Sequence, residues 1–186
     1  MAIEEPSYSV LATEGNFELR RYSSYIVAET TVEGNFEAVG NEGFRRLAAY
    51  IGGKNRKKES ISMTAPVSQK PASEKIAMTA PVSQRGKNGQ WRITFMMPSA
   101  YRLETLPIPD DDRVVLREEK EKTVAVILYS GTWRKKRYED HEKKLMEWIS
   151  KKGWKMVGAP AWARYNPPFM PWFMRRNEIL IPVKSQ

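Results

Sequence analysis

The heptapeptide Met63-Thr-Ala-Pro-Val-Ser-Gln69 occurs again, without change, as Met78-Thr-Ala-Pro-Val-Ser-Gln84, fifteen residues later. An isoleucine stands two residues before each copy, at Ile61 and Ile76. Chance does not place seven identical residues twice within so short a span. At least one copy therefore occupies a position where the fold requires this sequence, and the other is either a second strand or an alternative register for the first.

A helical pattern precedes the repeated heptapeptide. Apolar and small residues recur at helical spacing from Phe36 to Ile51, and Asn35 is a suitable N-cap. The pair Gly52-Gly53 supplies a left-handed stop after this segment. Within it, Gly40 and Gly43 have no side chain, so a strand or a flat ligand could approach the helix backbone closely.

A second helix is predicted from about Lys135 to Lys152, with Gly153 as its stop. Strand patterns are predicted at 17–32, 91–97, 113–118, 123–130, 162–165 and 178–183. The order gives two β-α-β-β halves, at about 8–106 and 110–184, within a single domain of residues 1–186. Burying these faces predicts an α+β fold, in which an antiparallel or mixed sheet curls into a distorted barrel with two helices packed on it.

Composition restricts the partners that this chain could have. Its 31 Lys and Arg residues outnumber 22 Asp and Glu residues, for a net charge of +9, which favours anionic partners. There is no cysteine, which excludes disulfides, thiolate metal sites and thiolate-ligated haem. No apolar run approaches the roughly 20 residues of a transmembrane helix. The N-terminus is not a signal peptide as written, so we expect a cytoplasmic protein, or an exported one if a signal preceded this sequence.

Six segments together resemble the SOUL haem-binding protein family. In order they are FELRRY (17–22), FRRLAAYIGGKN (44–55), IAMTAPV (76–82), ITFMMP (93–98), ARYNPP (163–168) and RRNEILI (175–181). Each is weak alone, but their order and their span from about Tyr8 to Lys184 make the set specific. The resemblance implies the same two-helix distorted barrel. It also favours the second heptapeptide copy as the core strand, because Lys75-Ile76-Ala77 precedes that copy, and leaves the first as an extra edge strand.

The resemblance further implies that the protein binds haem or another tetrapyrrole and acts as a carrier, buffer or sensor rather than as an enzyme. The implied site lies between the first helix and the loop 166–177. Some family members carry a proposed histidine ligand just before the tyrosine of the first strand. This chain has Arg21 at that position, before Tyr22, so histidine ligation of that kind is not expected.

The apolar loop is expected to fold onto the body of the protein, to contact a membrane or partner, or to form the wall of a pocket. Its segment Phe169-Met-Pro-Trp-Phe-Met174 is entirely apolar, is stiffened by prolines and is flanked by arginines. Apolar walls with guanidinium groups at the rim suit a flat macrocycle that carries carboxylates. Alternatively, the aromatic residues close the barrel end and the arginines pair with Glu178 and its neighbours. The predicted ligand-binding residues are Phe44, Leu47, Met78, Arg164, Phe169, Trp172, Phe173, Arg175 and Arg176.

Candidates for iron ligation are weak. His141 is the sole histidine, and it lies on the apolar stripe of the second helix, where a hydrogen-bonded core histidine is the commoner role. Met63 is the other weak candidate, because thioether sulfur can ligate haem iron although methionine usually fills cores. We therefore expect binding that is mostly hydrophobic and electrostatic, by a monomer or weak homo-oligomer.

Other functional classes find little support in the sequence. There is no P-loop, dinucleotide-binding glycine pattern or GxSxG motif, and the triple Asp110–Asp112 is predicted as a solvated turn. The basic cluster Arg134–Arg137 has no nucleic-acid-binding motif beside it. The alternative function is a small-molecule effector-binding module of the multidrug-sensor type, whose apolar cationic ligands the basic composition disfavours.

Overall fold

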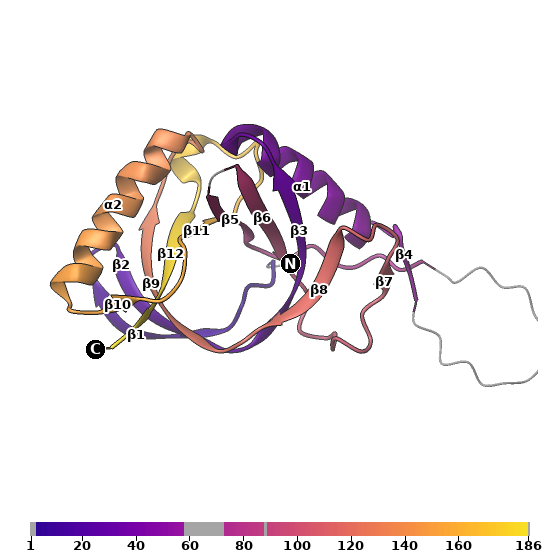
Figure 1. The fold of residues 1–186 in the computed structure, drawn as a ribbon, viewed down its shortest axis with the longest axis horizontal. Helices are drawn as coiled ribbons and strands as arrows, with labels where there is room; N and C mark the ends of the chain where they lie inside the picture. The colour runs from indigo at the N-terminus through magenta and orange to yellow at the C-terminus, as the bar shows by residue number, and fades with distance from the viewer. Residues whose placement is uncertain (1–2, 58–72, 88, 186) are drawn as a thin grey trace, which may run out of the picture.

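The computed structural model describes residues 3–57, 73–87 and 89–185 (Figure 1). The elements are β1 (Tyr8–Glu14), β2 (Phe17–Tyr22), β3 (Tyr25–Glu33), α1 (Phe36–Ile51), β4 (Asn55–Arg56), β5 (Val82–Lys87), β6 (Gln90–Met96), β7 (Ile108–Pro109), β8 (Val114–Glu119), β9 (Lys122–Tyr129), α2 (Lys135–Lys151), β10 (Lys155–Met156), β11 (Ala161–Arg164), the 3-10 turn η1 (Trp172–Met174) and β12 (Asn177–Lys184). The first heptapeptide copy, with Met63, lies outside the described residues. The second copy leads into β5.

The main sheet follows the order β1-β2-β9-β12-β11-β5-β6-β3-β8, and every pairing along it is antiparallel. Figure 1 shows that it curls strongly, with both helices on its outer side. Over the described residues the path runs from β1 to β8 without closing, so the sheet is a half-barrel. The predicted α+β class with a curled sheet and two helices is confirmed, and the sheet is antiparallel rather than mixed.

The two halves of the chain follow the same order and interlock. The segment β3-α1-β5-β6 corresponds to β9-α2-β11-β12, and the halves meet where β5 pairs with β11. The strand before each unit pairs with the other unit, since β2 lies beside β9 and β8 beside β3. Each half therefore needs the other to complete its part of the sheet.

A capping residue marks the start of α1, and a glycine follows the end of each helix. The Asn35 side chain accepts a hydrogen bond of 2.9 Å from the Ala38 N–H, which makes it the N-cap of α1. After α1, Gly53 has φ of 112°, and after α2, Gly153 has φ of 71°, so each chain reversal uses a glycine in the left-handed region. Among the described residues, neither helix is long and apolar enough to cross a membrane.

Both helices pack against one face of the sheet through a shared aromatic cluster. The Phe36 ring of α1 makes edge contacts, at centroid distances of 5.2–5.4 Å, with Trp91, Tyr138 and Trp162. These rings come from α1, β6, α2 and β11, so the cluster joins both helices to the centre of the sheet. Aromatic pairs in this geometry add to the free energy gained from burial alone.

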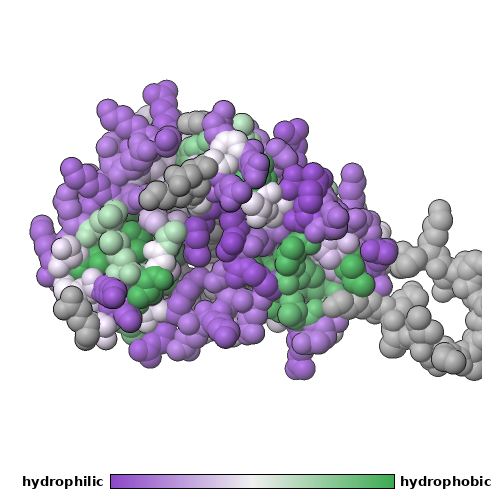
Figure 2. Space-filling view, in the orientation of Figure 1, coloured by the Kyte–Doolittle hydropathy of each residue, from purple (hydrophilic) through white to green (hydrophobic). Residues whose placement is uncertain are grey.

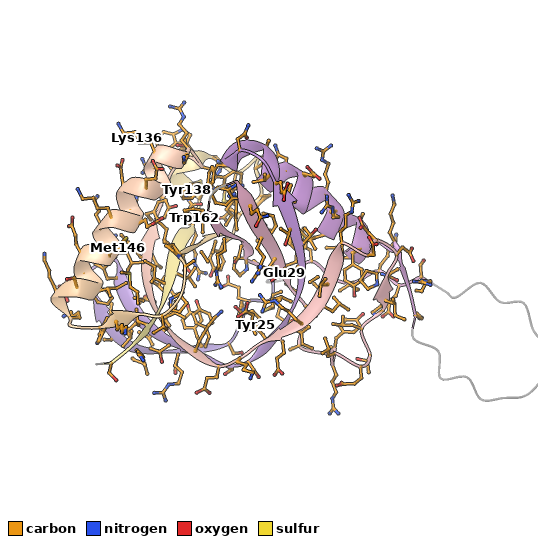
Figure 3. All side chains as sticks on the ribbon, in the orientation of Figure 1. Tyr25, Glu29, Lys136, Tyr138, Met146 and Trp162 are labelled. Atoms are coloured by element: carbon orange, nitrogen blue, oxygen red, sulfur yellow. The ribbon has the colours of Figure 1, made fainter. Side chains whose placement is uncertain are left out.

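The other face of the sheet lines the inside of the curl and is more polar. Figure 3 shows Tyr25 and Glu29 on the inside, whereas Tyr138 and Trp162 lie between α2 and the sheet. Ion pairs join Glu29 to Arg117 and Arg92 there, at 2.6 Å and 3.1 Å. Figure 2 accordingly shows hydrophilic side chains in the middle of this view, between two separate apolar areas.

Two strand predictions differ from the structure. The expected strand 17–32 is broken at Ser23-Ser24 into β2 and β3, which pair with different neighbours. No glycine or proline marks the break, so no local signal in the sequence indicates it. The exposed edge strand β1 was not predicted, since it lacks an alternating apolar pattern.

Candidate ligand-binding site

A cavity of about 260 Å³ opens between α1, the second heptapeptide copy and the segment after β11. The heptapeptide contributes Met78, Thr79 and Ala80, while α1 contributes Phe44 and the loop contributes Pro168. This volume is close to the lower end of the roughly 300–1,000 Å³ typical of small-molecule sites. The cavity is open on one side, so it suits a ligand that inserts part of its apolar surface.

The heptapeptide forms one wall of the cavity and is held in place by hydrogen bonds to β6 and to the N-terminal segment. The Thr79 hydroxyl donates to the Met96 carbonyl at 2.5 Å, and the Ala80 N–H donates to the Glu4 carbonyl at 2.9 Å. Thr79 and Ala80 are buried, whereas the Met78 side chain is 45% exposed at the cavity. The bond from the Thr79 hydroxyl gives a physical reason for a threonine at this position.

Arg164 is the cation of the cavity lining. Its Nε donates to the Tyr138 hydroxyl at 3.0 Å, its Nη2 donates to Gln84 Oε1 at 3.4 Å, and its guanidinium lies 5.1 Å from the Trp133 ring centroid. Gln84 is itself held by a 3.3 Å hydrogen bond from its Nε2 to the Phe36 carbonyl. None of the contacts of Arg164 among the described residues is a carboxylate. This half-buried guanidinium could therefore donate hydrogen bonds to an anionic group of a ligand.

The two glycines of α1 do different things. A Cβ at Gly43 would lie 2.3 Å from Ile93 Cγ1, so this glycine lets β6 pack directly against the helix. A Cβ at Gly40 would lie 3.3 Å from Gln84 Oε1 and 3.5 Å from Arg164 Nη1. Gly40 thus leaves room for the polar end of the cavity, whereas Gly43 allows β6 to approach the helix closely.

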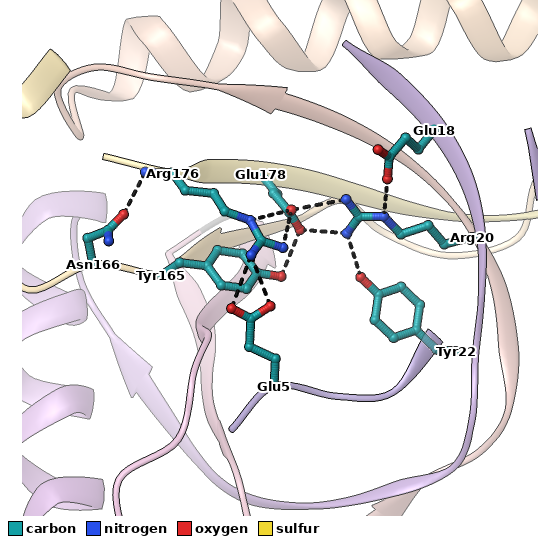
Figure 4. Close-up of polar contacts among 8 residues, drawn as sticks. All are labelled: Glu5, Glu18, Arg20, Tyr22, Tyr165, Asn166, Arg176 and Glu178. Atoms are coloured by element: carbon teal, nitrogen blue, oxygen red, sulfur yellow. Dashed lines mark hydrogen bonds and ion pairs between the residues drawn. The ribbon is translucent and has the colours of Figure 1, made fainter. Parts of the chain in front are cut away.

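A buried polar network fixes the base of the loop 166–176 (Figure 4). Glu178 forms hydrogen bonds or ion pairs of 2.7–3.1 Å with Arg20, Arg176 and the Tyr165 hydroxyl. Arg176 also contacts Glu5 at 3.0 Å, and its backbone N–H donates to Asn166 Oδ1 at 2.6 Å. The two ends of the loop are therefore joined.

The network shifts the pKa values of its members. Burial and the charge of Glu178 raise the pKa of Tyr165 well above 10.0, so its hydroxyl stays protonated and donates to Glu178. Burial alone would lower the pKa of Arg20, but hydrogen bonds and charge attraction from Glu178 outweigh it, and the pKa is raised. The Glu178 carboxylate is therefore occupied by hydrogen bonds and ion pairs with other residues of the protein.

Arg175 holds the loop itself. Its Nε donates to the Met170 carbonyl at 2.8 Å, its Nη2 donates to the Pro168 carbonyl at 2.6 Å, and its guanidinium lies 4.3 Å from the Trp133 ring centroid. The side chains at the tip of the loop point into solvent, since Phe169 is 86% exposed and Trp172 is 58% exposed.

The predicted site residues consequently lie in several different environments. Phe44, Met78 and Arg164 line the cavity, whereas Leu47 is fully buried in the core. The structure places the remaining residues either on the exposed loop or in contacts with protein groups, and these are Phe169, Trp172, Phe173, Arg175 and Arg176.

His141 lies away from this cavity, on the α2 side of the sheet. Its ring stacks on Tyr129 at a centroid distance of 4.0 Å, and its Nδ1 lies 2.7 Å from the Arg137 carbonyl. Its position beside Tyr129 is half-buried, as expected for the apolar stripe. Across the residues that the structure describes, no three His, Cys, Asp or Glu side chains gather in a way that could hold a metal ion.

Several lining residues were not predicted. Gln84 belongs to the repeated heptapeptide, so the repeat indicated that this residue matters. Its position at the polar end of the cavity was not predicted. Trp133 precedes α2, and its contact with the loop is made across the fold, to Arg164 and Arg175. No local pattern predicts such a contact.

Comparison of sequences identifies relatives over most of the chain. The model of the SOUL heme-binding protein family matches residues 3–182. Heme-binding protein 1 of Xenopus tropicalis is 26% identical over 166 residues, which cover 88% of this chain and 81% of the relative. Heme-binding protein 2 of Mus musculus is 28% identical over 137 residues, which cover 70% of this chain and 62% of the relative.

Comparison of structures agrees with the fold described above. The crystal structure of the EcmrR C-terminal domain superimposes with a TM-score of 0.61 at 13% identity, covering 96% of this chain and 99% of that one. At this identity the likeness concerns the fold alone. The family model, which spans nearly all of the sequence, shows that the chain belongs to the SOUL heme-binding protein family.

Proposed function

We propose that this protein binds haem or a related tetrapyrrole in the cavity beside α1 and acts as a carrier, buffer or sensor rather than as an enzyme. Its family membership and the names of its relatives support this proposal. The observation that carries it is Arg164, a half-buried cation in a largely apolar cavity with no carboxylate among its contacts in the described residues.

The residues present fit such a ligand. Phe44, Met78, Val82 and Pro168 offer apolar surface to one part of a flat macrocycle. The Arg164 guanidinium would pair with a carboxylate at the rim of the ring, where charge-assisted hydrogen bonds are strong. When bound, haem would supply its iron, and this chain would contribute mainly enclosure and charge.

Under this proposal the protein contributes little or no axial ligation to the haem iron. Met78 is the lining residue with a sulfur atom, and thioethers can ligate haem iron. Tyr165 also lines the cavity, but its hydroxyl donates a hydrogen bond to Glu178 at 2.7 Å. Our proposal therefore assigns binding to the apolar walls and to Arg164.

Titration of the purified protein with haemin, followed by the Soret band at low and high salt, tests the proposal. We expect saturable one-to-one binding that weakens with salt. Arg164→Gln should weaken it about tenfold or more, because a hydrogen bond to a charged group contributes about 1.5–3 kcal/mol. The matched control is Arg45→Gln, an equal change of charge on the exposed side of α1.

Either of two results would argue against this function. Unsaturable haemin uptake would show that there is no defined site, and equal affinities of the two arginine variants would remove the role of Arg164. Saturable binding of a lipophilic cation in competition with haemin would favour an effector-binding module instead. The positive charge of Arg164 makes that outcome unexpected.

A further inference from the structure

The loop that borders the cavity presents an unusual amount of apolar surface to solvent. Phe169, Trp172, Phe173 and Met174 are 86%, 58%, 61% and 61% exposed. They lie within six residues of chain around η1, so they form one projection rather than scattered positions. Large apolar side chains gathered in this way at a surface mark a contact with another apolar medium or molecule.

Several backbone positions of this loop either lack an N–H or are hydrogen-bonded within the loop, which suits a medium that offers few hydrogen bonds. Pro167, Pro168 and Pro171 have no N–H, and the N–H groups of Met170 and Met174 donate to the carbonyls of Pro167 and Pro171 at 3.1 Å and 3.0 Å. Unpaired backbone groups are costly in a membrane, so internal pairing favours entry into the lipid interface.

The Arg175 side chain adds two hydrogen bonds to the backbone of the loop and helps to keep it rigid. It donates to the carbonyls of Met170 and Pro168, and its guanidinium stacks on Trp133. The loop ends are fixed by Tyr165, whose N–H donates to the Arg176 carbonyl at 3.3 Å, and by the Asn166 contact to Arg176. Little conformational entropy remains to be lost when the tip enters another phase.

Positive charge lies next to the apolar projection. Trp133, which contacts Arg175, is followed by the exposed Arg134, Lys135 and Lys136 at the start of α2. Figure 1 shows the start of α2 at the same end of the half-barrel as the loop, and Figure 3 shows Lys136 pointing away from the sheet there. Cations beside exposed aromatic side chains suit the headgroup region of an anionic bilayer.

We propose that the tip of this loop inserts into the interface of an anionic lipid membrane, with the basic start of α2 contacting the headgroups. A bilayer fits these features better than a protein partner, because a projecting tip requires no complementary pocket to bury its side chains. The proposal does not depend on haem binding. Its consequence for the cavity is direct, since Pro167, Pro168 and Trp133 line it and would lie at the membrane surface.

The test uses the ligand-free protein with vesicles of phosphatidylcholine, either pure or mixed with phosphatidylserine. We expect co-sedimentation with the mixed vesicles that decreases with salt, and quenching of tryptophan fluorescence by brominated lipid. The double variant Trp172→Ser with Phe173→Ser should lose at least about tenfold in affinity, as expected from the apolar surface withdrawn. Val157→Ser changes a side chain that is 51% exposed at a separate site and should keep the affinity.

Charge is tested in the same assay with a second pair of variants. Lys136→Gln should weaken binding to the mixed vesicles about fivefold, the ratio that corresponds to about 1 kcal/mol per cation near an anionic surface. Lys151→Gln, at the other end of α2, should have no such effect. Circular dichroism checks that each variant is folded.

Three results would overturn the proposal. The wild-type protein could fail to bind the mixed vesicles, the loop variant could bind them as the wild type does, or the loop could bind a protein while leaving vesicles unbound. Haemin titration of the same samples is a separate measurement, so failure of the membrane proposal does not affect the proposed ligand site.

Discussion

Arginine occurs in two contrasting settings within this fold, one on each side of Tyr165. In the buried network, Arg20 and Arg176 are paired with Glu178, and the carboxylate and both cations are satisfied within the protein. In the cavity, Arg164 contacts a hydroxyl, an amide and aromatic rings. The difference lies in the carboxylate: among the described residues Arg164 has none as a partner, which is why we propose it, and not Arg20 or Arg176, as the contact for a ligand.

The largest effect should come from breaking the network. Glu178→Gln leaves Arg20, which is 0% exposed, with the partly exposed Glu18 as its remaining carboxylate partner. We expect the free energy of unfolding to fall by about 3–5 kcal/mol, the usual effect of removing one partner of a buried ion pair. Urea denaturation measures it.

The matched control for the network variant is Glu139→Gln. Glu139 pairs with Lys135 on the surface of α2, where both side chains are 57% exposed. Removing a surface pair should change the free energy of unfolding by at most about 1 kcal/mol. Equal effects of the two variants would mean that the buried network does not stabilise this fold.

The next comparison uses the glycines of α1. Gly43→Ala should lower the free energy of unfolding by about 1–3 kcal/mol, because its Cβ would overlap Ile93. Gly40→Ala should leave stability unchanged or raise it by up to about 1 kcal/mol, the helix propensity gained. The same variant should weaken haemin binding, since its Cβ would press on Gln84 and Arg164.

Thermal unfolding and haemin titration of both glycine variants distinguish packing from cavity space. If Gly40→Ala kept full haemin affinity, the polar end of the cavity would not be part of the ligand site. If Gly43→Ala were as stable as the wild type, the close approach of β6 to α1 would be less tight than the structure indicates.

An effect of similar size is expected from one of two buried tyrosines. Tyr165→Phe removes the hydroxyl that donates to Glu178 at 2.7 Å, and we expect a loss of about 1–3 kcal/mol. The hydroxyl of Tyr129 is also buried but has no hydrogen-bond partner among the described residues. Tyr129→Phe should therefore be neutral or stabilising in urea denaturation, and a loss as large as that of Tyr165→Phe would contradict this assignment.

The smallest effect concerns the pH dependence of His141. Burial lowers its pKa below 6.5, with further lowering by Lys144, while the hydrogen bond to the Arg137 carbonyl and the charge of Asp140 oppose the shift. A lowered pKa means that the folded state favours the neutral ring. The stabilisation is present above about pH 6.5 and is lost as the pH falls through the folded-state pKa.

His141→Gln should therefore lose slightly less stability than the wild type on acidification from about pH 7 to 5, the range in which an unperturbed histidine titrates. The measurement is the melting temperature across this range. The Soret spectrum of the haemin complex should stay unchanged in this variant. A low-spin spectrum that disappears with the substitution would identify His141 as an iron ligand after all.

The sequence predicted those parts of the fold that depend on local patterns. The helix Phe36–Ile51 agrees to the residue, since helical periodicity, the Asn35 cap and the glycines that follow are all encoded within a few neighbouring positions. The repeated heptapeptide also predicted that one copy is required by the fold. In the described residues the second copy has this role, because Thr79 and Ala80 form a wall of the cavity and the chain then continues into β5.

Tertiary structure decided the role of each arginine and of the apolar loop. Arg20 and Glu178 are 158 residues apart, so no local spacing could pair them or leave Arg164 without a carboxylate. Likewise, the proline-rich composition of the loop indicated rigidity, but only its position at the end of the half-barrel exposed Phe169 and Trp172. Periodicity and capping are properties of neighbours along the chain, whereas charge pairing and exposure depend on which distant strands the curled sheet brings together.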